Sequence, residues 1–256
     1  MTDIIKKPDG SSSLTLNKDK LSSKSTPFQQ RVNEAKAQQA DASTMPNRIA
    51  LMLDCSSSMS SYADNIGRAS QPTKRCIDLL KEAIENFAMR CNFTDTSLAF
   101  ETFPPGTELP LTSNELIVRM TAQALEPRGS TPMHACVERC IEKIPMTRAV
   151  LVSDGEATDW HDFDCDDVFQ EAKGKGTVLD RYKEMQIPID CVHIGASQDG
   201  EALLRHIAQA TGGLYIKFTD VSAFSTAFGF LAPSCRAMLT NGRIDASQLG
   251  AKELLR

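Results

Sequence analysis

The stretch RIALMLDCSSS at residues 48–58 decides the fold. Its apolar run, residues 49–53, is bounded by polar residues, which is typical of a strand buried on both faces. Asp54 ends the run, and Ser56 and Ser58 follow two and four residues later. Ligands of open α/β sheets bind beyond the carboxyl ends of such strands. The carboxylate and hydroxyl oxygens at this position are hard ligands, which suit Mg²⁺ or Mn²⁺ rather than zinc.

Strand and helix patterns alternate from this stretch as far as residue 231. Further strands are predicted at residues 97–103, 109–111, 149–152, 187–194 and 214–218. Helices are predicted at residues 73–90, 115–125, 132–144, 168–185, 201–210 and 221–231. The alternation predicts an α/β fold with a doubly wound, mostly parallel central sheet flanked by helices. The short strand at residues 109–111 is expected at an edge of this sheet.

Two further polar residues are expected beside Asp54. Asp154 follows the central strand at residues 149–152, and Thr131 precedes a helix whose first residue is Pro132. This position makes Thr131 the expected N-cap of that helix. Right-handed crossovers place the carboxyl ends of parallel strands, and the helix starts that follow them, on one edge of the sheet. Asp54, Thr131 and Asp154 are therefore predicted to converge at one rim.

The helix at residues 115–125 has its own predicted cap and inner face. Asn114 is the expected N-cap, because its side chain can accept a hydrogen bond from the first turn. The residues expected to pack inward are Leu116, Ile117, Met120 and Ala124.

The three polar segments together resemble the von Willebrand factor A (VWA) domain with a metal-ion-dependent adhesion site, or MIDAS. That family has Asp-x-Ser-x-Ser after its first strand, a Thr in a later loop and an Asp after its central strand. The corresponding residues of this chain are Asp54, Ser56, Ser58, Thr131 and Asp154. The resemblance extends over residues 47–231 and matches all three parts in order.

This resemblance implies a metal site and a protein partner. Ser56 and Ser58 would bind Mg²⁺ (or Mn²⁺ or Ca²⁺) directly, and Thr131 would do so in the ligand-competent state. Asp54 and Asp154 would hold the ion directly or through water. An open coordination position would accept an Asp or Glu carboxylate from a partner protein. With few carboxylates in direct contact, the ion would keep a positive charge that attracts this group.

The composition favours an intracellular member of the family, of the prokaryotic or phage type. No run of about 18 apolar residues and no apolar signal region is found, so we expect a cytoplasmic protein without a membrane span. The eight cysteines are then expected to be reduced and mostly buried. Many prokaryotic members work beside MoxR-type AAA+ ATPases, which makes such an ATPase a candidate partner.

Nucleic acid is not an expected partner, because the body of the chain is acidic. Residues 1–46 contain seven of the 28 Lys and Arg and five of the 33 Asp and Glu, which leaves 21 basic and 28 acidic residues in the remainder. Binding to a phosphate backbone depends on an excess of basic residues.

The chain is predicted to have three parts. Residues 1–45 are expected to be a disordered tail, residues 46–232 the VWA domain, and residues 233–256 a C-terminal extension in which residues 246–255 can form a short helix. Residues 59–71 form a long polar loop, either a partner contact or a neutral insertion. Residues 154–167 contain seven acidic residues and no Lys or Arg. This acidic rim attracts cations and counts against an acidic partner.

The enzyme signatures that the chain could carry are absent. No Gly-x-Ser-x-Gly elbow, Walker A motif or Gly-x-Gly-x-x-Gly turn follows a predicted strand. The alternative from the enzyme class is a metal-assisted phosphoesterase that uses Asp54, Asp154 and His161. A site with few direct carboxylates is poorly suited to hold two metal ions. A non-catalytic interaction module is therefore the preferred interpretation.

Overall fold

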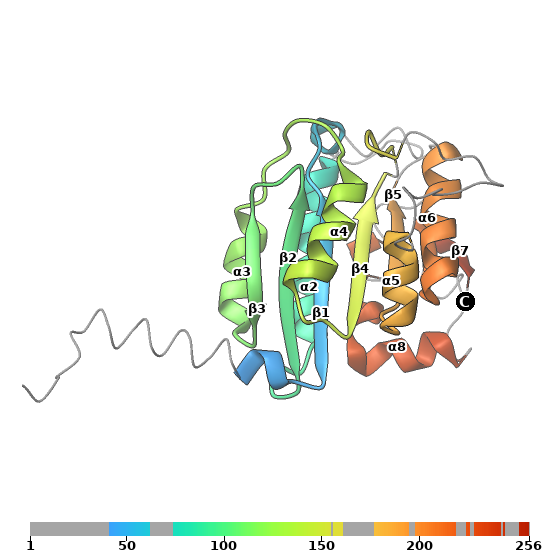
Figure 1. Cartoon of the computed structure of the whole chain (residues 1–256). Helices are drawn as coiled ribbons and strands as arrows, with labels where there is room; N and C mark the ends of the chain where they lie inside the picture. Colours follow the sequence, from blue (N-terminus) through green and yellow to red (C-terminus); the bar gives the residue numbers. More distant parts are fainter. Residues whose placement is uncertain are drawn as a thin grey trace, which may run out of the picture. The chain divides into compact units, whose positions relative to one another are not determined.

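Figure 1 shows the ribbon of the protein, which is a computed structural model. The described residues are 41–61, 74–154, 156–160, 177–194, 198–218, 224–225, 228–241, 243 and 251–255. The predicted tail lies outside them as far as residue 40, and so do the long polar loop after residue 61 and the acidic loop after Trp160. Residues 41–44 are helical and Ala42 is buried, so the last residues of the predicted tail belong to the folded unit.

A seven-stranded sheet forms the centre of the described part of the chain, in the order β3-β2-β1-β4-β5-β6-β7. The strands are β1 (Asn47–Asp54), β2 (Thr96–Phe103), β3 (Glu108–Thr112), β4 (Arg148–Ser153), β5 (Ile189–Ile194), β6 (Tyr215–Phe218) and β7 (Ala251–Leu255). The five inner strands are parallel, and the two outer strands are antiparallel to their neighbours. This confirms the predicted α/β fold, with β3 at an edge.

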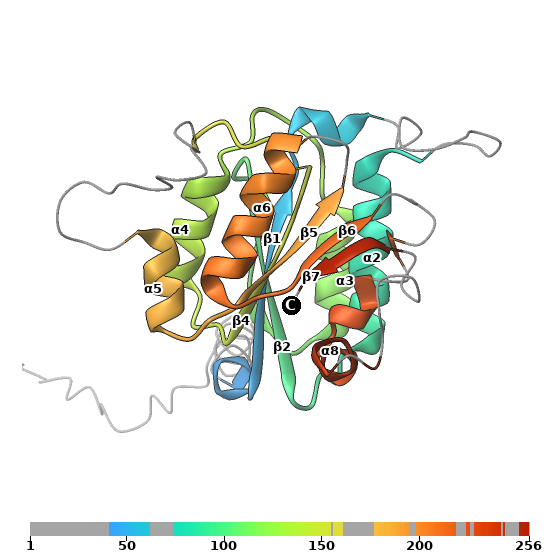
Figure 2. The ribbon, with the colours of Figure 1, turned by 90° about the vertical axis from the view of Figure 1, so that its right-hand side faces the viewer.

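Helices cover both faces of this sheet (Figure 2). One face carries α2 (Cys76–Arg90) and α3 (Glu115–Gln123), and the other carries α4 (Met133–Lys143), α5 (Val178–Glu184) and α6 (Gln198–Thr211). In β1, Ile49, Leu51 and Leu53 belong to the core cluster that includes α2, whereas Ala50 and Met52 belong to the cluster that includes α4. A strand between two apolar layers must be apolar at every position, which explains the unbroken run in the sequence.

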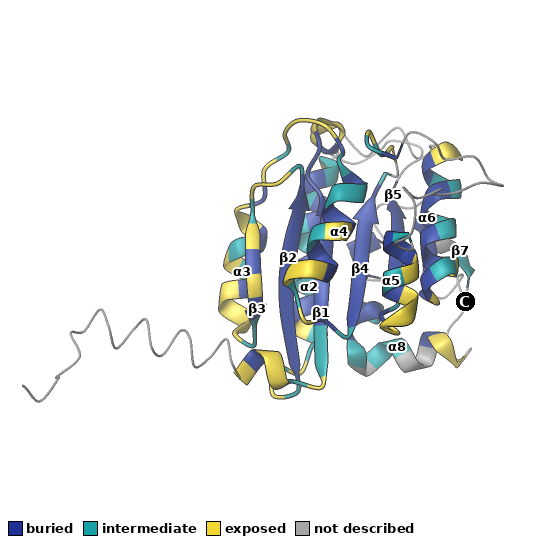
Figure 3. Cartoon of the chain, in the orientation of Figure 1, coloured by how far each residue is buried: buried dark blue, intermediate teal, exposed yellow. Residues whose placement is uncertain are grey.

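The inner strands are buried over almost their full length (Figure 3). Every residue of β2, β4, β5 and β6 is buried. Each fully buried Val, Leu or Ile side chain contributes about 1.5–3 kcal/mol. A shift of one residue would exchange the two faces of a strand, so this burial fixes the register. The fixed register also fixes the place of the polar residues that follow each strand.

Helix α3 turns a different face to the core from the one predicted. The predicted inner residues are exposed: Leu116 (65%), Ile117 (40%), Met120 (65%) and Ala124. Val118 and Ala122 are buried instead. These two residues also have the four-residue spacing of a helix face, so the sequence contained two apolar faces. The helix packs mainly on α2 beside the edge strand β3, and a narrow strip is enough for that contact.

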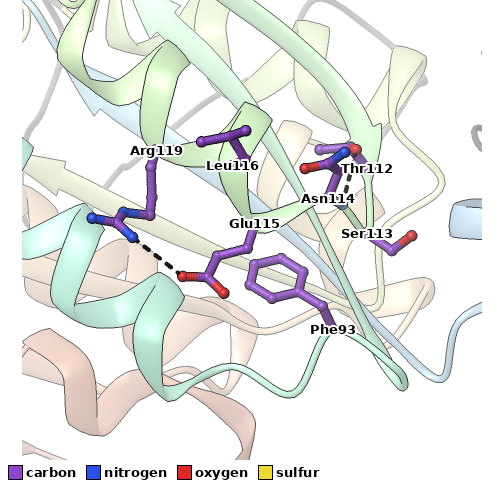
Figure 4. Close-up of a pocket in the computed structure, with 7 residues that line it drawn as sticks. All are labelled: Phe93, Thr112, Ser113, Asn114, Glu115, Leu116 and Arg119. Atoms are coloured by element: carbon purple, nitrogen blue, oxygen red, sulfur yellow. Dashed lines mark hydrogen bonds and ion pairs between the residues drawn. The ribbon is translucent and has the colours of Figure 1, made fainter.

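Leu116 lines an open hollow at the end of the sheet where β2 begins (Figure 4). The other lining residues are Phe93, Thr112, Ser113, Asn114, Glu115 and Arg119. Asn114 caps α3 as predicted, since its side chain accepts a hydrogen bond from the Ile117 N–H at 3.3 Å. The hollow lies at the opposite end of the sheet from Asp54, because β1 and β2 run parallel and Asp54 pairs with Phe103 at the far end of β2.

The C-terminal third differs most from the sequence prediction. Helix α5 begins at Val178, where Thr177 and Asp180 form a capping box, and residues 168–176 of the predicted helix lie outside the described residues. The helix predicted at residues 221–231 ends as a short 3₁₀ helix, η4 (Gly229–Leu231), and α8 (Pro233–Thr240) follows. The short helix predicted at residues 246–255 is wrong for residues 251–255, which pair with β6 as β7. The open edge of β6 overrides the helix propensity of Ala, Lys, Glu and Leu.

A buried ion-pair network joins α8 to the sheet. The fully buried carboxylate of Asp190 accepts hydrogen bonds from Nε and Nη2 of Arg236, each at 2.8 Å, and from Nη1 of Arg148 at 3.3 Å. The Leu214 N–H donates to the same carboxylate at 2.8 Å. Burial lowers the pKa of Arg148 to about 10, although the charge of Asp190 opposes this shift. Arg236, from the predicted C-terminal extension, therefore completes an interaction of the core.

We expect the Asp190→Ala variant to lower the free energy of unfolding by about 3–5 kcal/mol, because it leaves the buried Arg148 without its counter-charge. Urea unfolding followed by circular dichroism measures this loss. Asp199→Ala, in the exposed first turn of α6, is the matched control and should cost less than about 1 kcal/mol. Equal losses in the two variants would contradict the proposed role of the network.

Candidate metal site

Four of the five predicted metal ligands are joined by hydrogen bonds at the carboxyl ends of β1 and β4. The Ser56 N–H donates to Oδ1 of Asp54 at 2.8 Å. The hydroxyl oxygens of Ser56 and Ser58 lie 2.8 Å apart, and the Ser58 hydroxyl donates to Oδ2 of Asp154 at 2.7 Å. The fold thus brings Asp54, Ser56, Ser58 and Asp154 together, although 96 residues separate Ser58 from Asp154.

The parallel pairing of β1 with β4 accounts for this convergence. Leu53 lies opposite Val152, so the residues that follow them are neighbours at the rim. The Ser153 hydroxyl donates to Oδ2 of Asp54 at 2.6 Å. Both carboxylate oxygens of the buried Asp54 therefore accept hydrogen bonds from the protein. Ser153 is a site residue that the sequence motif does not include, and its position directly before Asp154 is the signal that could have found it.

Thr131 lies in a loop that is tied to the same rim through the backbone. The Ser57 N–H donates to the Gly129 carbonyl at 3.0 Å, and the Arg128 N–H donates to the Cys55 carbonyl at 2.7 Å. Gly129 has a φ of 64°, in the left-handed region that favours glycine. Among the hydrogen bonds of the described residues, none joins the Thr131 side chain to the other four predicted ligands. The structure therefore places its loop beside them without such a hydrogen bond.

The predicted capping role of Thr131 is wrong, because Asp159 provides the side-chain cap of α4. The two carboxylate oxygens of Asp159 accept hydrogen bonds from the His134 N–H at 3.0 Å and the Ala135 N–H at 2.9 Å. A negative charge at a helix N-terminus also interacts favourably with the helix dipole. Thr131 contributes its carbonyl, which accepts the Thr158 N–H at 2.9 Å. Its hydroxyl is thus not used to cap the helix.

His193 supports Asp154 from the neighbouring strand β5, where it pairs in register with Ser153. Its Nε2–H donates to the Asp154 carbonyl at 3.0 Å, and Nδ1 lies 3.1 Å from the Tyr215 hydroxyl. Burial and the charge of Lys217 lower the pKa of His193 to about 4. The ring is therefore neutral near pH 7, with one donor and one acceptor nitrogen. The only feature of the sequence that indicates a role for His193 at this site is its position near the end of the strand that pairs with β4.

The electrostatics of the site favour a bound cation. Burial and the nearby Asp154 carboxylate raise the pKa of Asp54 to about 6. A cation beside these two carboxylates would favour the ionised form of both. Burial raises the pKa of the Cys55 thiol to about 12, and its side chain packs in the core. This agrees with its spacer position in the motif.

The donor set fits a hard divalent cation. Its atoms are carboxylate and hydroxyl oxygens, which suit Mg²⁺, Mn²⁺ or Ca²⁺. In the described part of the chain, no three His, Cys, Asp or Glu side chains gather in the manner of a metal site. The candidate oxygen donors at this rim are the hydroxyls of Ser56 and Ser58 and the carboxylates of Asp54 and Asp154.

Comparison with known proteins shows the fold. No protein-family model and no curated protein sequence matches the chain. The solved vWF domain of the type V pili tip protein Mfa5 from Porphyromonas gingivalis is similar, with 11% identity, a TM-score of 0.52, and coverage of 76% of this chain and 96% of that one. This similarity shows that the fold is of the VWA type.

Two other solved structures have lower TM-scores. BatB from Bacteroides thetaiotaomicron has 15% identity and a TM-score of 0.49, with coverage of 72% of this chain and 95% of that one. The SpRpn10 VWA domain has 15% identity and a TM-score of 0.46, with coverage of 64% of this chain and 82% of that one. Separately, none of the described helices has the length and apolar character that a membrane span requires.

We expect Asp159→Ala to lower the free energy of unfolding by about 0.5–2 kcal/mol, because it removes the cap of α4. Thr131→Val keeps the shape of its side chain and removes only the hydroxyl, so it should cost less. Urea unfolding in the absence of divalent cations compares the two variants. A larger loss for Thr131→Val than for Asp159→Ala would show that Thr131 is the cap after all.

Proposed function

We propose that this protein is a non-catalytic interaction module that binds a partner protein through a divalent cation, Mg²⁺ or else Mn²⁺ or Ca²⁺. The proposed ligands are Asp54, Ser56, Ser58, Thr131 and Asp154. The observation that carries the proposal is the hydrogen-bonded set of Asp54, Ser56, Ser58 and Asp154 at the carboxyl ends of adjacent parallel strands. A VWA-type fold with this donor set is the arrangement that the MIDAS resemblance predicts.

The serines and Asp54 have distinct proposed parts in holding the ion. The hydroxyl oxygens of Ser56 and Ser58 would be direct ligands. Both oxygens of Asp54 already accept hydrogen bonds from the protein, so Asp54 orients the Ser56 backbone and supplies negative charge, with contact to the ion through water. The ion would present a Lewis-acidic open position to a carboxylate of the partner. Few direct carboxylate ligands leave it enough positive charge for that contact.

In the acidic segment after β4, one carboxylate has a structural partner. Asp159 is committed to the N-terminus of α4, where its charge is matched by two backbone N–H groups and the helix dipole. Glu156 is exposed, and its N–H donates to Oδ1 of Asp154 at 3.3 Å. The charge of Asp159 thus has a structural role in the fold.

The phosphoesterase alternative has less support. His161 lies outside the described residues. His193 is buried and its two ring nitrogens are engaged by Asp154 and Tyr215, so it is not placed to transfer a proton to a substrate. A cytoplasmic AAA+ ATPase of the MoxR type stays the candidate partner that the family resemblance supplies.

We expect Mg²⁺ to stabilise the wild-type protein by roughly 2.7 kcal/mol at a concentration 100-fold above its Kd, because it binds the folded state alone. Thermal unfolding in Mg²⁺ and in EDTA measures the effect. Ser58→Ala should abolish most of it, whereas Ser57→Ala, at the neighbouring spacer position with an exposed side chain, should retain it.

The partner is tested by affinity capture from the native cell with each of these proteins. A protein retained by wild type and Ser57→Ala in Mg²⁺, and lost in EDTA and with Ser58→Ala, supports the proposal. A complex that is insensitive to both EDTA and Ser58→Ala would refute the metal-dependent mechanism.

A further inference from the structure

Arg128 lies directly beside the candidate metal site. Its N–H donates to the Cys55 carbonyl at 2.7 Å, and the next residue, Gly129, accepts the Ser57 N–H at 3.0 Å. These two backbone hydrogen bonds are on either side of Ser56, a proposed ligand. The base of the Arg128 side chain is therefore fixed relative to the ion site by the same contacts that join the two loops.

The guanidinium group is also held in place, although Arg128 is exposed. Its Nη2 donates to the Pro105 carbonyl at 2.7 Å. It lies over Gly106, since a Cβ atom on Gly106 would be 1.1 Å from Nη2. The absence of a side chain at Gly106 thus makes room for the guanidinium. A long side chain fixed in this way loses little conformational entropy when it binds a ligand.

The positive charge of Arg128 has no carboxylate partner among the described residues. Arg139 and Arg148 differ in this respect, since each forms an ion pair with a buried carboxylate. An arginine has five N–H donors in a planar fork that fits a carboxylate. Of these, one is committed to Pro105 within the described part of the chain. The remaining donors are suited to an anion supplied by another molecule.

We infer that Arg128 is a second anchor for the partner, so that the partner is an acidic peptide segment with two Asp or Glu side chains. One carboxylate would bind the cation, and the other would bind the Arg128 guanidinium. This inference rests on the proposed function, and it adds the requirement for a second acidic residue. Arg128 thereby distinguishes a di-acidic segment from one with a single carboxylate.

Selection of random peptides displayed on phage tests this inference with the full chain as bait in Mg²⁺. The wild type should enrich peptides with two acidic residues at a constant spacing. Arg128→Met, which removes the donors and keeps an unbranched side chain, should enrich peptides with a single acidic residue. A wild-type-selected synthetic peptide should bind Arg128→Met at least about tenfold more weakly. Arg119→Met is the matched control and should behave as wild type, because Arg119 is a partly exposed residue of α3 that lines the hollow at the opposite end of the sheet.

A second variant moves the charge without removing it. The Cβ of Gly106→Ala would displace the guanidinium, which is the flexible end of a side chain, so the fold should be unaffected. This variant should also bind the di-acidic peptide more weakly, with an unchanged midpoint of thermal unfolding. It keeps the inference testable if Arg128→Met proves to be poorly folded.

The outcomes separate this inference from the proposed function. If Arg128→Met and Gly106→Ala select and bind the same peptides as wild type, or if the wild type enriches no di-acidic peptide, the inference about Arg128 is wrong. If the di-acidic peptide binds equally well in EDTA and to Ser58→Ala but more weakly to Arg128→Met, the proposed metal dependence fails while the anchoring role of Arg128 stands.

Discussion

The parallel pairing of β1 with β4 is the constraint on which the rest of the site depends. It brings the carboxylates of Asp54 and Asp154 to one end of the sheet, with Asp54 fully buried. A buried carboxylate is costly unless it is hydrogen-bonded. Ser153 and the Ser56 backbone satisfy it, and in doing so they fix the start of the loop that carries both serines. The fold therefore stabilises the arrangement that a cation would use.

Three described segments at this rim are held by contacts from distant parts of the chain. Cys55 and Ser57 pair with the loop before α4 through the backbone, and Asp159 caps α4 from the segment after β4. Because Asp159 caps α4, the Thr131 hydroxyl is not part of the helix cap. The Arg128 side chain lies at the surface. At the opposite end of the sheet, the buried Asp190 binds Arg236 and so attaches the C-terminal part of the chain. The core is thus completed by residues that lie beyond the predicted domain.

The sequence predicted features that depend on burial over a whole strand. Residues 49–53 and 149–152 are apolar throughout because they lie between two helical layers, and the polar residues after them must then meet at one rim. Features decided by a single distant contact were not predictable. No local pattern shows that Asp159 caps α4, that residues 251–255 complete the sheet edge, or that α3 packs through Val118 rather than Leu116. In each case two conformations or faces satisfy the local pattern, and the tertiary contact selects one.

The cation site is tested most directly by the anomalous scattering of Mn²⁺ in crystals of the protein grown with this ion. We expect a peak at direct coordination distance, about 2.0–2.6 Å, from the hydroxyl oxygens of Ser56 and Ser58, on the side of Asp154. This peak should be absent in crystals of Ser58→Ala grown in the same way. A wild-type crystal with Mn²⁺ bound only elsewhere, or with no anomalous peak at these two serines, would show that this rim is not a cation site.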